Sequence, residues 1–503
     1  MSSIRHRVDT LEAFPSWFYV RLLLLTGFSW AQNAAEFVLF VMTRQPMAEN
    51  TRLHTFAVEA MGGGVLIGAA VGGPLFGRIA DLQGRRWALL LAKTLSLVGL
   101  MACALATRDY EVISARILAG IGIGGELPVA ATVVHEMTPR SMRGRMIALL
   151  EAFTGVGGIV GVMLAFVLVP QFGWRITYLL LCSGIFYVGM LCFLLPEFPS
   201  WLARSGRIVE AGATVENLEH AHGTRLIYDI SLMKKTRTTE AGEVEEAVET
   251  GKSSAFDKRV EAVMQWTLWI VMALSSNALG MYVPILISLT GYNMLSRWNT
   301  MMLLHMSQVL GSVLASLVLK EFGIKKVLVV STSLAAIIAV ILTYTPWYGS
   351  IVVMGTCTIS LMLAASWSCV LVRVPTTFPV QVRGFGVGLA FGLGRLSSIG
   401  GSWLCPRMYN VWKLSVPAFA WVFASLLVIA VLVSTIPYRR QSIKTPSDHN
   451  TKSKTKLDCT LVVGHNSPIH KSQKNEMSTA HIHRRVDSLD VRLSWFYMVH
   501  SKF

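Results

Sequence analysis

The chain has 503 residues, of which 53% are hydrophobic and only 15% are charged. Soluble globular chains carry roughly a quarter charged residues, so this composition excludes an ordinary soluble protein and favours membrane-spanning segments. A net charge of +16 could indicate a nucleic-acid binder, but the basic residues lie between apolar segments. The seven cysteines show neither CxxC pairing nor histidines at metal spacing. No P-loop, GxSxG or HExxH motif is present, so we expect no enzyme activity, no metal and no cofactor.

Twelve apolar runs are long enough to cross the hydrocarbon core as helices, which takes about 20 residues each. In chain order they are 17–42, 57–78, 87–106, 111–134, 145–170, 174–195, 264–288, 299–320, 326–344, 350–373, 384–406 and 416–437. This pattern predicts an all-α membrane protein with twelve transmembrane helices in two six-helix bundles.

Lysine and arginine gather in the loops on one side of these spans, which by the positive-inside rule places both termini in the cytoplasm. The division expected along the chain is a cytoplasmic N-terminus (1–16), an N-terminal six-helix bundle (17–198), a cytoplasmic linker with a helix or two (199–262), a C-terminal six-helix bundle (263–437) and a disordered basic cytoplasmic tail (438–503). The plasma membrane is the favoured location, and an organelle membrane stays open.

The loop after the second span reads Gly77-Arg-Ile-Ala-Asp81-Leu-Gln-Gly84-Arg85-Arg86. An acidic residue there can face the positive N-terminus of another helix, and the arginines can partner it. The alternative is an ordinary positive-inside loop. The segment resembles the GxxxDxxGRR signature of the major facilitator superfamily, and a degraded copy with Lys320 in the acidic position follows the eighth span. In that superfamily this cluster acts as a latch of the outward-open state.

Further motifs in the first half extend the resemblance. The chain from the fourth span to the end of the sixth is similar to metabolite–proton symporters of the superfamily, closest to bacterial niacin permeases and synaptic-vesicle-glycoprotein-like transporters. Ser200 stands where sugar porters have arginine, and the seventh span lacks their glutamines. These differences make a sugar porter a less favoured interpretation. The resemblance implies a cytoplasmic gate made of Gly77, Asp81, Gly84, Arg85, Arg86, Glu136, Arg143, Glu151, Glu197 and Arg383.

Charged residues inside the spans are costly and usually serve function. Glu36 in the first span and Arg116 in the fourth lie at similar depth, at a rise of ~1.5 Å per residue, so we expect them to pair and to couple transport to protons. The alternative is that Arg116 extends to the lipid headgroups. Glu126 is the second candidate for proton coupling. For Glu151 there are two interpretations: a role in the gate, or simple packing against the arginines of 140–145.

Polar and aromatic side chains of the spans are expected to line a substrate cavity. They are Trp30, Gln32, Asn33, Asn277, Tyr282, Trp367 and Arg395. A guanidinium such as that of Arg395 can hold a carboxylate through paired hydrogen bonds. For each aromatic residue, ordinary packing is the competing interpretation.

The expected function is secondary active transport by alternating access, with a small organic acid or related metabolite moved together with protons. The partners implied are the substrate, protons and the lipid bilayer, without nucleic acid, and the protein is expected to be a monomer. Three alternatives stay open: a uniporter; a carrier of organic cations, sugars or phosphate; and a transporter-like receptor without flux.

The two ends of the chain share a repeat. Residues 7–20 and 485–498 are identical at eight of fourteen positions. The second copy is either a remnant of a tandem duplication or a juxtamembrane motif that lies on the membrane through its aromatic residues.

Overall fold

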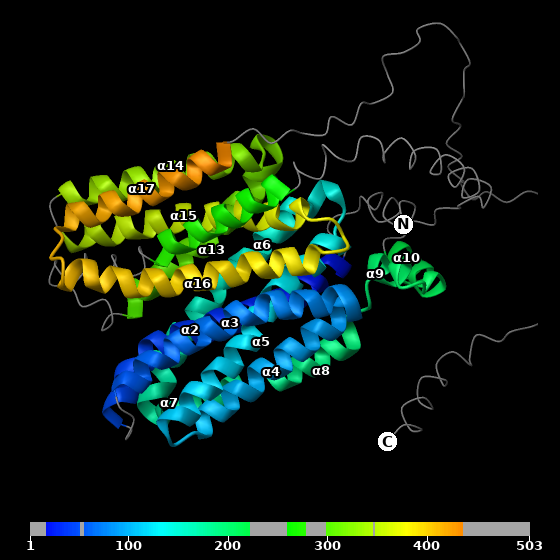
Figure 1. Cartoon of the computed structure of the whole chain (residues 1–503), viewed down its shortest axis with the longest axis horizontal. Helices are drawn as coiled ribbons and strands as arrows, with labels where there is room; N and C mark the ends of the chain where they lie inside the picture. Colours follow the sequence, from blue (N-terminus) through cyan, green and yellow to red (C-terminus); the bar gives the residue numbers. More distant parts are fainter. Residues whose placement is uncertain (1–16, 51–54, 222–258, 278–297, 346–347, 436–503) are drawn as a thin grey trace, which may run out of the picture. The chain divides into compact units, whose positions relative to one another are not determined.

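The computed structural model describes residues 17–50, 55–221, 259–277, 298–345 and 348–435. All of them belong to the unit Met1–Tyr438, which is distinct from Arg439–Phe503. Within the described residues every regular element is helical (Figure 1). Eight of these helices are long and apolar enough to cross a membrane.

The first half contains five long helices followed by shorter ones. They are α2 (Trp17–Asn50), α3 (Thr55–Gln83), α4 (Arg85–Leu105), α5 (Asp109–Met137), α6 (Arg140–Met163), the π-helical turn η1 (Leu164–Leu168), α7 (Val169–Leu181), α8 (Gly184–Leu194), α9 (Pro199–Arg204) and α10 (Ile208–Ala221). Gly173 has a φ of 76°, a left-handed conformation that suits glycine. The chain turns there between the fifth and sixth spans, in agreement with the predicted boundary.

The sixth span differs from the prediction of one continuous helix. It is divided at Cys182 and Ser183 into the C-terminal part of α7 and the following α8. Gln32 of α2 donates a hydrogen bond to the Leu181 carbonyl at 2.9 Å, and its side chain lies against Gly184. The interruption thus exposes a carbonyl oxygen that a distant polar side chain satisfies.

The second half begins with a helix over 259–277. It continues with α13 (Trp298–Phe322), α14 (Ile324–Tyr344), α15 (Gly349–Thr377), α16 (Arg383–Asn410) and α17 (Val416–Thr435). α13 to α17 match predicted spans within a few residues, and the helix over 259–277 overlaps the predicted span 264–288. Residues 1–16, 222–258 of the linker, 278–288 of the seventh span with Tyr282, and the tail with its repeat lie outside the described residues.

Glycines allow α3 of the first half to pack directly on α16 of the second. A Cβ atom at Gly77 would lie 2.2 Å from the carbonyl oxygen of Gly384, and one at Gly388 would lie 2.1 Å from that of Gly73. No larger side chain fits at such distances, so the two backbones touch along this seam. A second contact between the halves joins α6 and α13, where Gly158 packs on the ring of His305.

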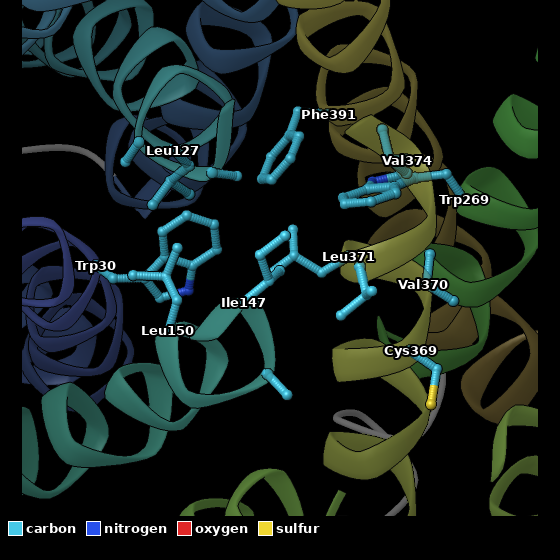
Figure 2. Packing of buried hydrophobic residues seen from close by; sticks show 14 of the residues in the cluster. Trp30, Leu127, Ile147, Leu150, Trp269, Cys369, Val370, Leu371, Val374 and Phe391 are labelled. Carbon is cyan, nitrogen blue, oxygen red and sulfur yellow. The ribbon is translucent and has the colours of Figure 1, made fainter. Parts of the chain in front are cut away.

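An apolar layer fills the space between the two halves. Figure 2 shows Trp30, Leu127, Ile147 and Leu150 of the first half facing side chains of the second. The Phe391 ring lies between them, with its centroid 6.1 Å from that of Trp30 and 4.5 Å from that of Trp269. Burial of these large apolar groups closes the centre of the described bundle to solvent.

Candidate functional site

Four buried charged residues connect α3, α4, α5 and α16 into one network, which we call the charge cluster: Asp81, Arg85, Glu136 and Arg383. Arg85 Nη2 lies 3.1 Å from Asp81 Oδ1, and its Nε lies 3.2 Å from Glu136 Oε2. Arg383 Nη1 lies 3.0 Å from Glu136 Oε1. Two carboxylates and two guanidiniums balance each other, as buried charges require. Because Arg383 belongs to the second half, the cluster ties the two halves together.

Asp81 has a second role at the start of α16. Its carboxylate accepts hydrogen bonds from the backbone N–H groups of Gly384 at 3.0 Å and Phe385 at 2.9 Å. These donors belong to the first turn of α16, where backbone N–H groups lack helical partners and the helix dipole favours a negative charge. The acid at the end of α3 therefore caps a helix of the other half, as the motif predicts.

The neighbouring gate candidates hold the start of α4. Gly84 adopts φ 110° directly before this helix, and Arg86 donates a hydrogen bond to the Cys192 carbonyl of α8. Glu197 accepts hydrogen bonds from the backbone N–H groups of Arg86 and Phe198, and burial raises the pKa of its carboxyl above the ordinary value. These contacts fix α4 to the segment that follows α8.

Arg143, also predicted at the gate, lies near the start of α6. Its guanidinium donates a hydrogen bond to the Thr138 carbonyl at 3.1 Å. This contact spans the turn between α5 and α6 and sets the direction in which α6 leaves it.

The predicted contact between Glu36 and Arg116 is present. Arg116 Nη1 lies 2.7 Å from Glu36 Oε1, and both side chains are almost fully buried. The guanidinium also lies over the rings of Phe40 and Tyr178, at 5.0 and 5.9 Å from their centroids. Arg116 is thus enclosed by protein and does not extend to a surface, contrary to the alternative that it snorkels.

Glu126 forms a second buried ion pair that connects three helices. Lys93 Nζ of α4 lies 2.9 Å from Glu126 Oε1, and Asn33 Nδ2 of α2 donates to Glu126 Oε2 at 3.2 Å. The Lys93 ammonium also lies 5.7 Å from the ring centroid of Tyr187. The sequence reasoning missed the role of Lys93, although a lysine two turns inside an apolar helix is itself a signal of function.

The predicted cavity residues divide into two groups. Asn33 donates to Glu126, whereas Gln32 donates to the Leu181 carbonyl of α7 within the first half. The place of both residues in a cavity stays a prediction. Asn277 donates to the Ser398 hydroxyl at 2.8 Å, and Trp367 donates to the Ser276 hydroxyl at 2.7 Å. Both bonds join helices of the second half.

Glu151 lies away from the charge cluster. Its carboxylate accepts hydrogen bonds from the Trp30 indole and from the Thr154 hydroxyl, the latter at 3.4 Å. It also interacts electrostatically with Arg395 of α16. Glu151 thus contacts the predicted cavity residue Trp30, and its role at the gate stays a prediction.

The described part of the chain has no group of three or more potential metal ligands. The described residues form two buried carboxylate–cation pairs inside the first half and the charge cluster between the halves, and Glu151 interacts electrostatically with Arg395. Such an arrangement can exchange protons and bind an ion, and it can switch between paired and unpaired states when helices move.

Comparisons with known proteins show which family the chain matches. Residues 22–402 match the family described as Major Facilitator Superfamily. The niacin transporter NiaP of Acinetobacter baylyi is 28% identical over 400 residues, which are 78% of this chain and 88% of that protein. The synaptic vesicle 2-related protein of Xenopus laevis is 27% identical over 281 residues, 56% of this chain and 49% of that protein.

The solved structure of XylE, a proton:xylose symporter, bound to 6-bromo-6-deoxy-D-glucose, shares the fold. It superposes with a TM-score of 0.68 at 19% identity and covers 83% of this chain and 95% of that chain. Twelve spans in two bundles, as the sequence predicts, are consistent with this fold. From the family match and the shared fold it follows that the chain belongs to the Major Facilitator Superfamily, as a multi-pass integral membrane transporter.

Proposed function

We propose that this protein carries a small organic acid or a related metabolite across the membrane together with protons, by alternating access. The similarity to a niacin transporter supports a compact aromatic acid such as nicotinate as the first substrate to test. The observation that carries the proposal is the buried pair of Glu36 and Arg116.

The Glu36–Arg116 pair supplies a physical route to coupling. Breaking one partner of a buried ion pair costs about 3–5 kcal/mol, because the other charge is left without compensation. Protonation of Glu36 would therefore release Arg116 to another anion or to a rearranged helix packing. The pair of Glu126 and Lys93 offers a second site of the same kind. The free energy of moving a proton could in this way change the balance between two conformations.

The proposed orientation puts both chain ends, the linker 199–262 and the tail 438–503 in the cytoplasm, with the protein in the plasma membrane as a monomer. The charge cluster then lies at the cytoplasmic end, and its contacts describe a state closed toward the cytoplasm. Opening requires the bundles 17–198 and 263–437 to part along the seam of α3 and α16, with loss of the Asp81 cap.

Uptake into proteoliposomes tests the proposal. Purified full-length protein would be reconstituted and given labelled nicotinate with and without an inward proton gradient. Accumulation above equilibrium that a protonophore abolishes is the expected result, and Glu36→Gln should remove accumulation while leaving binding. Equal entry with and without the gradient would indicate a uniporter, and uptake of an organic cation, sugar or phosphate in place of nicotinate would indicate that kind of carrier. Binding without uptake would indicate a receptor.

A further inference from the structure

Glu151 differs from the other two carboxylates deep in the first half. Glu36 and Glu126 each have a buried cation within 3 Å. Among the described residues, Glu151 has no ion-pair partner within 4 Å, and its hydrogen-bond donors are the neutral groups of Trp30 and Thr154. It is half-buried. Its charge is therefore the one of the three that the fold leaves without local compensation.

The positive charge that interacts with Glu151 belongs to the other half of the molecule. Arg395 of α16 is half-buried and interacts electrostatically with Glu151. Contacts between Glu136 and Arg383 show that α5 ends, and hence α6 begins, at the end of the bundle where α16 begins. At ~1.5 Å per residue, Glu151 lies about 16 Å along α6 and Arg395 about 18 Å along α16. The two residues therefore lie at a similar depth, each one helical turn beyond a residue of the apolar layer, Ile147 on α6 and Phe391 on α16.

We infer that Glu151 and Arg395 form one proton-sensitive subsite, in which Glu151 competes with the carboxylate of the substrate for the Arg395 guanidinium. This inference rests on the proposed function. An ionised Glu151 attracts Arg395 and repels a second carboxylate. A neutral Glu151 keeps its hydrogen bonds to Trp30 and Thr154 but leaves the guanidinium to the substrate. Binding of an organic anion is then linked to uptake of one proton at Glu151.

The helices packed against α6 carry other titratable groups: two carboxylates that are already paired, a buried thiol and an imidazole. Glu36 of α2 is paired with Arg116, and Glu126 of α5 is paired with Lys93. Cys369 of α15 is buried. His305 of α13 faces Gly155 and Gly158 of α6 and shares a hydrogen bond of 3.0 Å with Gln308. His305 is therefore the group whose titration must be separated from that of Glu151.

Equilibrium binding of labelled nicotinate to the full chain in lipid nanodiscs tests the inference. Measurements near about pH 6 and about pH 8 keep the ligand carboxylate ionised, because carboxyl groups of ordinary pKa lie well below this range. The wild type should bind nicotinate more tightly at the lower pH. Glu151→Gln should bind nicotinate about tenfold more tightly than the wild type at the higher pH, because the competing negative charge is lost. Its affinity for nicotinate should be the same at both pH values. Nicotinamide, which has no carboxylate, should bind both proteins alike.

Matched variants make the result specific. Glu151→Asp should keep the dependence on pH, and His305→Gln should keep it as well. If Glu151→Gln retains the pH dependence of the wild type, or if nicotinamide responds as strongly as nicotinate, the inference is overturned.

A measurement without ligand separates this inference from the proposed substrate class. Thermal unfolding of Glu151→Gln, Arg395→Gln and the double variant should be non-additive, because the two side chains interact in the empty protein. Additive shifts would refute the subsite whatever the substrate. If the shifts are non-additive but the protein binds no organic acid, the interaction of Glu151 with Arg395 is supported and the proposed substrate class is refuted.

Discussion

Lys93 should stabilise the fold because it compensates the buried charge of Glu126, so its loss should matter only when Glu126 is ionised. The ammonium and the carboxylate are 2.9 Å apart, with side chains 1% and 0% exposed. Lys93→Met keeps the length and apolar stem of the side chain but leaves the carboxylate with only the Asn33 amide. Removal of one partner from a buried ion pair costs about 3–5 kcal/mol, so the free energy of unfolding should fall by about that amount.

The double variant Lys93→Met, Glu126→Gln is the decisive comparison. Replacing a buried ion pair by neutral groups of similar volume is often close to neutral, and the side-chain amide that replaces the Glu126 carboxylate retains a hydrogen bond with Asn33. We therefore expect the double variant to recover most of the loss, within about 1–2 kcal/mol of the wild type. Equilibrium unfolding by SDS in bicelles, followed by near-ultraviolet circular dichroism, would give the four free energies of the cycle.

A matched control is available at the end of α13. Lys320 is exposed, so Lys320→Met should change the free energy of unfolding by less than about 0.5 kcal/mol. The ion pair does not stabilise the fold in the way described if Lys93→Met lowers the free energy of unfolding by less than about 1 kcal/mol. The same conclusion follows if the double variant is no more stable than the less stable of the two single variants.

Three further outcomes follow from contacts at the end of the bundle that carries the charge cluster. Gly77→Leu should force α3 and α16 apart, because its Cβ would lie 2.2 Å from the Gly384 carbonyl oxygen; spin-label distances across the seam should lengthen, and unchanged distances would contradict the packing. Asp81→Asn removes the charge that caps α16 and should weaken the closed state by about 1–2 kcal/mol, seen as a larger population of long distances in the same measurement. Burial raises the pKa of Glu197 above its ordinary value of 4.5, so the contribution of Glu197 to folding stability is complete below pH 4.5 and is lost as pH rises through the folded pKa. The melting temperature of the wild type should therefore fall over this range of pH, and Glu197→Gln should reduce the fall. An equal fall in the variant would exclude Glu197 as its source.

Apolar length and glycine spacing made most of the fold predictable. The turn at Gly173 and the starts of α13 and α16 lie within a few residues of the predicted boundaries, because each follows from where an apolar run ends. The break between α7 and α8 could not be predicted in this way. Cys182, Ser183 and Gly184 stand within a run that is otherwise mostly apolar and long enough for one span, and the side chain that satisfies the Leu181 carbonyl comes from Gln32, far away in the sequence.

The candidate site was predictable where local spacing or depth determines a contact. The motif around Asp81 and Arg85 predicts a helix cap, and equal depth predicts the pair of Glu36 and Arg116. Lys93 was not predictable as the partner of Glu126, because nothing in the spacing shows which helices lie side by side. The contacts of Glu151 with Trp30 and Thr154 were not predictable for the same reason: its position along α6 can be read from the sequence, but the neighbours of its helix face cannot.

The seam between α3 and α16 has a consequence for how quickly the two halves can exchange positions. At Gly73, Gly77, Gly384 and Gly388 backbone meets backbone, so no side chain at these positions has to change its rotamer when one helix tilts against the other. Along this seam the charged groups at one end, Asp81, Arg85, Glu136 and Arg383, then contribute much of the resistance to opening. In such a transporter the glycine contacts let α3 and α16 move against each other, and the charge cluster holds them in place. Substitutions in the charge cluster should therefore alter the rate of turnover far more than substitutions on the lipid-facing sides of the same helices.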